Sequence, residues 1–114
     1  MSYTYLASPY SHPDPAVVAR RTRQARQATA VLMCRGVAVF SPIAHTHDLV
    51  PFTGGQSHDF WMAQDVPLLL KASRVMVLCL DGWQESRGVQ EEIRLAKLAG
   101  IAVCYMDENW VEHE

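Results

Sequence analysis

Glu92 is the side chain in this sequence best placed to carry chemistry. It lies in the stretch Ser86-Arg-Gly-Val-Gln-Glu-Glu-Ile-Arg-Leu-Ala96, which follows a strongly apolar run. If the stretch is a helix capped by Ser86, about 100° of rotation per residue gathers its apolar residues on one side. Glu92 falls at the margin of that stripe, where a carboxylate is costly unless it is paired or hydrogen-bonded. It is therefore either a functional carboxylate or a structural one favoured by the helix dipole.

The start of the same helix has the groups that bind anions. Ser86, Arg87 and Gly88 place a hydroxyl, free backbone N–H groups and a glycine that allows close approach at a helix N-terminus. The simpler interpretation is that Ser86 only caps the helix. Neither G-x-x-x-x-G-K nor a G-x-G-x-x-G after the first strand occurs. The sequence therefore predicts no P-loop and no dinucleotide fingerprint.

The segment His45-Thr-His47-Asp48 is a candidate for metal binding, because two imidazoles and a carboxylate lie close in sequence. In an extended segment both imidazoles would project to the same side. No second group of ligands with typical spacing accompanies them, so we expect a polar loop that lines a pocket, and no metal or cofactor. His12, in an earlier loop, could line the same pocket. The absence of G-x-S-x-G argues against an esterase.

Short apolar runs alternate with helical patterns along the chain, which predicts an α/β fold with a parallel sheet. We expect one domain over residues 1–114: a three-layer sandwich of the flavodoxin or Rossmann-like kind, with four to five strands in the order 2-1-3-4. Residues 43–58 are irregular, and the acidic tail 107–114 is either helical or a fifth element. The predicted strands are 3–7, 37–40, 74–80 and 101–105, and the predicted helices are 15–35, 59–71 (with Pro67 as a kink or false start) and 86–99.

The predicted strand order places a ligand site near Glu92. In open α/β sheets, ligands bind beyond the carboxyl ends of the strands, where the strand order reverses. Here that point lies between the first and third strands, so the loops 8–15 and 81–86 flank it. The second of these loops leads directly into the helix that carries Glu92.

Composition limits the classes of protein that this chain can belong to. With 114 residues and a net charge of −2, we expect no binding to nucleic-acid polymers. Arg20, Arg21, Arg23 and Arg26 are expected on the solvated face of their helix. No apolar run reaches about 18 residues and no signal peptide is visible, so we expect a cytoplasmic protein without a membrane span. Three cysteines without a C-x-x-C predict buried free thiols.

Several motifs together resemble the nucleoside 2-deoxyribosyltransferase superfamily, which includes deoxynucleoside 5'-monophosphate N-glycosidases. The resemblance spans residues 3–105 and is strongest to small bacterial and phage proteins of that group. The motifs that carry it are Tyr5-Leu-Ala-Ser-Pro-Tyr10, Phe40-Ser-Pro42, Asp65-Val-Pro-Leu-Leu-Leu-Lys-Ala-Ser-Arg-Val-Met-Val-Leu78, Ser86-Arg-Gly-Val-Gln-Glu-Glu-Ile-Arg-Leu-Ala96 and Gly100-Ile-Ala-Val103.

The resemblance implies a role for each matched residue. Glu92 matches the nucleophile that attacks the anomeric carbon of the sugar. Tyr5 matches a tyrosine that orients this glutamate, and a hydrogen bond donated by its hydroxyl would favour the charged form of the carboxylate. Asp65 matches an aspartate near the sugar and the leaving base. Ser86 matches a serine that holds a 5'-phosphate, and Asp81 is a looser match to an acid that contacts the base. Substrate-binding roles are also expected for Ser8, Tyr10, Arg87 and Gly88.

The resulting hypothesis is a nucleotide or deoxynucleotide N-glycosidase that forms a covalent glycosyl intermediate. Its expected partners are a small nucleoside or nucleotide and further copies of itself, as a homodimer or homotetramer. Two departures from the family pattern keep alternatives open: Arg94 stands where glycine is frequent, and the chain lacks much of the transferases' C-terminal part. The alternatives are a non-catalytic nucleotide-binding or sensor module, a nucleoside deoxyribosyltransferase, and a purely structural interaction protein.

Overall fold

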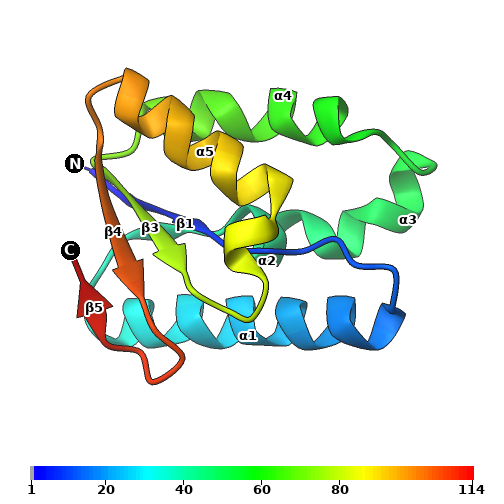
Figure 1. The fold of residues 1–114 in the computed structure, drawn as a ribbon, viewed down its shortest axis with the longest axis horizontal. Helices are drawn as coiled ribbons and strands as arrows, with labels where there is room; N and C mark the ends of the chain where they lie inside the picture. Colours follow the sequence, from blue (N-terminus) through cyan, green and yellow to red (C-terminus); the bar gives the residue numbers. More distant parts are fainter. Residues whose placement is uncertain (1) are drawn as a thin grey trace.

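The computed structural model describes residues 2–114 as a five-stranded sheet with helices on both faces (Figure 1). α1 lies on one side of the sheet, and α4 and α5 lie on the other. The strands are β1 (Thr4–Ala7), β2 (Val39–Phe40), β3 (Arg74–Leu78), β4 (Ala102–Met106) and β5 (Glu112–His113). The helices are α1 (Pro15–Cys34), α2 (Pro42–Thr46), η1 (His47–Leu49), α3 (Val50–Thr53), α4 (His58–Leu70), η2 (Trp83–Glu85) and α5 (Arg87–Leu98).

The strands follow the order β2-β1-β3-β4-β5, which confirms the predicted order 2-1-3-4 and adds a fifth strand at the edge. The first four strands are mutually parallel, and β5 pairs antiparallel with β4. Tyr5 pairs with Val75 and Leu6 pairs with Met76 in the register between β1 and β3. The α/β class with a mostly parallel sheet is therefore confirmed.

Alternation along β1 and β3 divides the core into two layers. Tyr5 and Val75 face the α4–α5 side, and Leu6 and Met76 face the α1 side. All four of these side chains are fully buried. The near-continuous apolar character of β3 is thus explained by helices on both of its faces.

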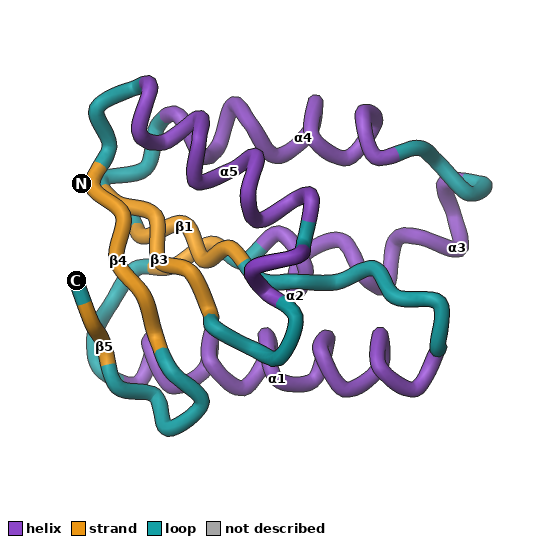
Figure 2. The backbone as a smooth tube through the Cα atoms, viewed as in Figure 1, coloured by secondary structure: helices purple, strands orange, loops and turns teal. Residues whose placement is uncertain are grey.

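Residues 43–58 differ most from the sequence expectation, because α2, η1 and α3 occupy the segment predicted to be irregular (Figure 2). Ser41 caps α2 by accepting a hydrogen bond from the Ala44 amide at 3.2 Å. Pro42 occupies the first turn, where its missing N–H is not needed. Each helix is too short to produce a recognisable apolar period, so the pattern could not reveal them. Pro67, expected as a kink or a false start, lies inside a continuous α4.

The C-terminal tail ends in a strand, so the helical alternative for residues 107–114 is wrong. Asp107 accepts hydrogen bonds from the amides of Asn109 and Val111, which closes the turn that leads into β5. Trp110 packs against the core cluster on the α1 side.

Two further expectations concern the burial of the cysteines and the presence of a membrane span. Cys34 is exposed rather than buried, and the other two cysteines are only partly buried; all three are free. None of the helices within residues 2–114 has the length and hydrophobicity needed to cross a bilayer.

Candidate active site

A cavity of about 540 Å³ opens beyond the carboxyl ends of β1, β2 and β3. The loop after each of these strands contributes to its wall, and α4 closes the remaining side. The site therefore lies at the reversal of strand order, as expected for an open α/β sheet. The lining residues are Ser8, Tyr10, Ser11, Pro42, Ile43, Thr46, Val50, Gln56, His58, Trp61, Met62, Asp65, Glu85, Ser86, Arg87, Gly88 and Glu92.

Glu92 on α5 is 7% exposed and lines this cavity, and Tyr5 on β1 is fully buried beside it. The Tyr5 hydroxyl donates a hydrogen bond to Oε2 of Glu92. The first turn of α5 begins at the Ser86 cap, whose Oγ accepts from the Val89 amide at 3.3 Å. Because α5 begins at this cap, Glu92 lies on the side of the helix that faces the sheet. Glu92 and Tyr5, which are 87 residues apart in sequence, thus form a single buried pair.

Burial raises the pKa of Glu92 to about 8, although the Tyr5 hydrogen bond lowers it; the charge of Asp65 raises it further. The hydrogen bond from Tyr5 thus favours the ionised form of Glu92, but desolvation outweighs it. Burial likewise raises the pKa of the Tyr5 hydroxyl, so Tyr5 remains a donor.

Asp65 reaches the cavity from α4, and burial raises its pKa to about 6, opposed by the charge of His45. Glu92 and Asp65 interact electrostatically, so their protons are released in two steps that belong to the pair. Between about pH 6 and pH 8 the pair therefore holds one proton. Two carboxyl groups in one cavity, of which one is protonated, can act as a nucleophile and an acid.

One face of α4 supplies four lining residues at helical spacing: His58, Trp61, Met62 and Asp65. Ser57 caps the helix by accepting from the Phe60 amide at 3.2 Å. Our sequence analysis selected only Asp65 from this set. The spacing i, i+3, i+4, i+7 was the signal that could have identified the other three, because these positions share a face of a helix.

The start of α5 forms one wall of the cavity with Ser86, Arg87 and Gly88. A Cβ atom on Gly88 would lie 3.9 Å from Cε1 of His58, an ordinary contact distance, so this wall lies next to the start of α4. The Nε2 atom of His58 lies 2.8 Å from Oε2 of Glu91 on α5. This hydrogen bond lowers the pKa of Glu91 and links the two helices beside the cavity.

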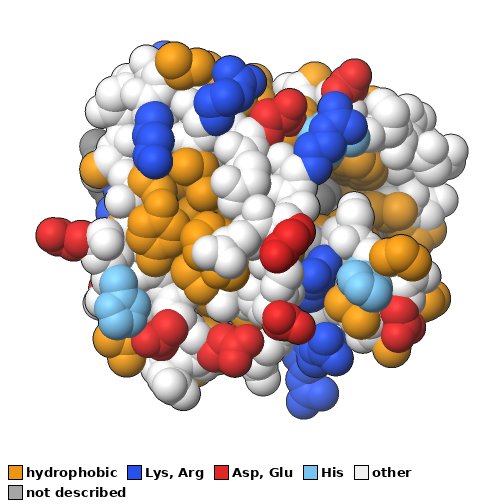
Figure 3. All heavy atoms as spheres, in the orientation of Figure 1, with side chains coloured by type: hydrophobic (Ala, Val, Ile, Leu, Met, Phe, Trp, Pro, Cys, Tyr) orange, Lys and Arg blue, Asp and Glu red, His pale blue; other side chains and the backbone are white. Residues whose placement is uncertain are grey.

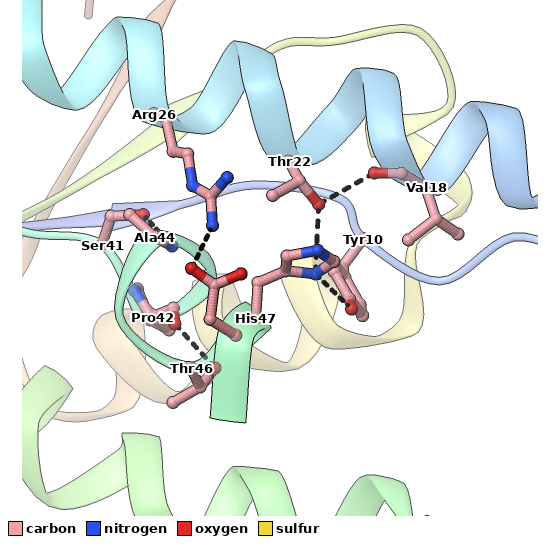
Figure 4. Close-up of polar contacts among 10 residues, drawn as sticks. Tyr10, Val18, Thr22, Arg26, Ser41, Pro42, Ala44, Thr46 and His47 are labelled. Carbon is pink, nitrogen blue, oxygen red and sulfur yellow. Dashed lines mark hydrogen bonds and ion pairs between the residues drawn. The ribbon is translucent and has the colours of Figure 1, made fainter. Parts of the chain in front are cut away.

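The loop after β1 contributes Ser8, Tyr10 and Ser11 to the wall. The Ser8 Oγ atom is buried without a hydrogen-bond partner. The Tyr10 hydroxyl lies 2.8 Å from Nδ1 of His47 (Figure 4). The same nitrogen lies 3.5 Å from Oγ1 of Thr22 on α1.

His47 therefore positions Tyr10, and the metal interpretation of His45-Thr-His47-Asp48 finds no support. Asp48 pairs with Arg26 on α1, with 2.9 Å between Oδ2 and Nη2. His45 and His47 lie on α2 and η1 rather than on an extended segment, so the argument from strand alternation does not apply. Within residues 2–114, no three His, Cys, Asp or Glu side chains are grouped so that they could hold a metal ion.

The structure does not bring every candidate residue into the cavity. Asp81 is exposed and lies in a separate depression, where its carbonyl oxygen accepts from Nη2 of Arg21 at 3.0 Å. His12 is exposed and is not among the lining residues. Arg21 was assigned to the solvated face of α1, but it is only 9% exposed. Counting charged residues along the helix could not distinguish it from its exposed neighbours Arg20 and Arg23.

Comparison with known proteins agrees with this architecture. Residues 2–108 match the family described as "Domain of unknown function (DUF1937)", and the chain belongs to that family. Among solved structures, the fold is similar to that of a 2-deoxyribosyltransferase from the psychrotolerant bacterium Bacillus psychrosaccharolyticus, with a TM-score of 0.68 and 21% sequence identity. The match covers 93% of this chain and 72% of that protein. No match was found among curated proteins.

Proposed function

We propose that this protein is an N-glycosidase that cleaves the bond between base and sugar in a nucleotide or deoxynucleotide. The observation that carries the proposal is the buried Glu92, hydrogen-bonded by Tyr5, in the wall of a cavity at the reversal of strand order. Asp65 supplies a second carboxyl group in the same cavity. The similarity in fold to a 2-deoxyribosyltransferase supports chemistry at the anomeric carbon of a nucleoside.

The proposed reaction has two steps, as in retaining glycosidases. In the first, a carboxylate oxygen of Glu92 bonds to the anomeric carbon while the carbon–nitrogen bond to the base breaks. The electrons of that bond go to the base, which takes a proton from Asp65. In the second, water attacks the same carbon and gives a proton to Asp65. The ester bond then breaks, which releases the sugar and restores ionised Glu92.

The raised pKa values leave one proton on the two carboxyl groups between about pH 6 and pH 8, and in the dominant form that proton is on Glu92. The form that reacts has one proton on the pair, with Glu92 ionised and Asp65 protonated. This form is the less populated of the two singly protonated forms, because the pKa of Glu92 is higher than that of Asp65. The positive charge that develops on the sugar as the bond to the base breaks favours the ionised carboxylate. Tyr5 then stabilises the ionised form by its hydrogen bond.

The wall at the start of α5 is proposed to hold the 5'-phosphate. The first amides of a helix have no partner within the helix, and Arg87 and Gly88 present theirs at the cavity. Arg87 adds a positive side chain beside them. Contacts to the phosphate would orient the sugar against Glu92, and such remote binding energy promotes the reaction.

Arg94 does not obstruct the proposed site. Its side chain is exposed and is absent from the cavity lining. The sensor alternative was motivated by Arg94, which stands where the family often has glycine. This arginine does not fill the cavity. A sensor remains the second candidate because the buried Glu92 holds its proton near neutral pH, which would suit binding without turnover.

The direct test is incubation with a mixture of nucleoside monophosphates and nucleosides, followed by mass spectrometry for free bases. We expect the wild-type protein to release base from at least one nucleotide. Glu92→Gln should remove this activity, because an amide is a poor nucleophile, whereas the exposed Glu108→Gln serves as a matched control. Nucleotide binding detected by thermal shift, with no base released from any compound, would establish the sensor instead.

A further inference from the structure

Arg21 is a buried cation that connects the two loops on either side of the candidate site. Its Nη1 donates to the Ser11 carbonyl at 2.9 Å, and its Nη2 donates to the Asp81 carbonyl at 3.0 Å. Ser11 belongs to the loop after β1, and Asp81 to the loop after β3. One planar guanidinium group thus spans two segments that are 70 residues apart in sequence.

The charge of Arg21 has no carboxylate to balance it. Among residues 2–114, the ion pairs of arginine are those of Arg26 with Asp48 and of Arg74 with Glu112. Burying a charged group away from water is unfavourable, and the fold recovers this cost only through the two carbonyl contacts. A guanidinium can make both contacts at once because its donors are fixed in one plane, which an ammonium group cannot imitate.

Gly82 makes room for this contact. A Cβ atom at this position would lie 2.5 Å from Nη2 of Arg21, closer than atoms can approach. Gly82 also has a φ of 86°, in the left-handed region that favours glycine. The backbone of this loop is therefore shaped around the guanidinium group.

Both loops held by Arg21 continue into the wall of the cavity. Ser11 lines the cavity itself. From Gly82 the chain passes through η2, whose turns are closed by hydrogen bonds from the Trp83 amide to Leu80 and from the Ser86 amide to Trp83. Ser86 then caps α5. A displacement at Asp81 is transmitted through this short, hydrogen-bonded path to the start of α5.

We infer that Arg21 is a positioning residue that sets the separation between the β1 loop and the start of α5, and so controls binding of the substrate rather than the reacting atoms. The inference rests on the proposed function for its kinetic consequence, but its structural consequence is independent of any activity. Arg21 does not line the cavity, so its effect reaches the substrate only through these two walls.

The test compares Arg21→Met with Arg23→Met, because Arg23 lies on the same helix and is exposed. With a nucleotide identified as substrate, Arg21→Met should raise KM about tenfold and change kcat less than about threefold, since Glu92 and Tyr5 are untouched. Arg23→Met should change neither. A residue that only stabilised the fold would instead reduce the amount of active protein and leave KM unchanged, and that result would overturn the inference.

Two further variants keep the test decisive if Arg21→Met folds poorly. Arg21→Lys retains the stem and the charge but cannot hold both carbonyls, so it should raise KM in the same direction. Gly82→Ala pushes the guanidinium away from Asp81 and should also raise KM, with an added loss of stability because φ at this position is 86°. An unchanged KM in Arg21→Lys would overturn the inference.

Amide hydrogen exchange separates this inference from the proposed function. In Arg21→Lys, exchange should accelerate in both residues 8–14 and residues 81–86, while the core strands β1 and β3 keep their protection. This outcome would support the inference even if no nucleotide is hydrolysed. Acceleration in only one loop, or in neither, would overturn it even if the protein proves to be an active N-glycosidase.

Discussion

At the scale of single residues, the shared proton of Glu92 and Asp65 determines how activity should depend on pH. The pKa of Asp65 is raised to about 6 and that of Glu92 to about 8, so the pair holds one proton between these values. Activity requires that singly protonated state. We therefore expect kcat/KM for base release to be bell-shaped, rising as pH increases toward about 6 and falling above about 8.

The measurement is a pH series of initial rates, with Asp65→Asn as the comparison. Removing Asp65 removes the negative charge that raises the pKa of Glu92. The remaining activity should then be low, should lose its alkaline limb and should rise with pH through a value below about 8. A wild-type profile that is flat from about pH 5 to pH 9 would contradict a role for either carboxyl group.

Glu92→Gln should also stabilise the protein at alkaline pH. The folded pKa of about 8 exceeds the ordinary 4.5, so folded Glu92 keeps a proton that the unfolded chain releases between these values. The contribution of protonated Glu92 to the free energy of unfolding is complete below about pH 4.5 and is lost as the pH rises toward 8. We expect the free energy of unfolding of Glu92→Gln, relative to wild type, to increase by a few kcal/mol from about pH 6 to pH 9. Equal pH dependence of both proteins would show that Glu92 titrates normally.

Ser86→Gly tests whether Ser86 has a role beyond capping α5. The hydroxyl accepts a hydrogen bond from the Val89 amide, so the cap is present. Glycine is a tolerated cap, and the loss of stability should be only a few tenths of a kcal/mol. A contact to a charged phosphate is worth roughly 1.5–3 kcal/mol, so preference for nucleotides over nucleosides should fall about tenfold to a hundredfold. Unchanged preference in kcat/KM would leave Ser86 as a helix cap alone.

The residues found from sequence and those missed differ in the kind of signal they give. Glu92 was identifiable because a carboxylate on the apolar side of a helix violates a local pattern. Arg21 and His58 violate none, since an arginine or a histidine on an amphipathic helix is ordinary. Their roles depend on contacts with segments 33 and 60 residues away, which no local pattern encodes.

At the scale of elements, long periodic segments were predictable and short ones were not. α1, β3 and α5 were expected within one or two residues of their ends, because apolar spacing and caps such as Asp14 define them. α2, η1 and α3 span three to five residues each and form because Ser41 and Pro42 start a helix that packs beside α1. The expectation that His45 and His47 project to one side is wrong for the same reason, since it assumed an extended segment.

α4 should depend strongly on one residue. Leu69 is its single fully buried side chain, whereas the adjacent Leu70 is 46% exposed. Leu69→Ala should lower the free energy of unfolding by about 2–5 kcal/mol, because it leaves a cavity against the sheet. Leu70→Ala serves as the matched control and should cost less than about 1 kcal/mol. Urea denaturation measures both, and similar losses would contradict the packing of α4 seen here.

At the scale of the whole molecule, the surface predicts self-association. Leu98 on α5 is 73% exposed, and Leu68 and Leu70 on α4 are also exposed. Apolar side chains gather over β4 on the face shown in Figure 3, where Val103 and Tyr105 are only partly buried. Apolar side chains that gather on a surface are a feature of interaction sites.

We therefore expect a homodimer or homotetramer in solution, measured by light scattering across a concentration series. Leu98→Glu should shift the assembly toward monomers, because a charge at an apolar contact is not tolerated. Lys97→Gln, on the same turn of the helix, makes the same change in net charge and serves as the control. A monomeric mass at every concentration would contradict the expectation.

The central claim is that Glu92 forms a bond to the sugar of a nucleotide, and trapping that bond tests it most directly. The wild-type protein is mixed with its nucleotide substrate, quenched in acid after milliseconds and digested for mass spectrometry. The account predicts one sugar phosphate attached to the peptide that contains Glu92, and free base in equal amount in the first turnover. Glu92→Gln should show neither. Release of base by a protein in which the attached sugar never appears, or appears on another residue, would contradict the account.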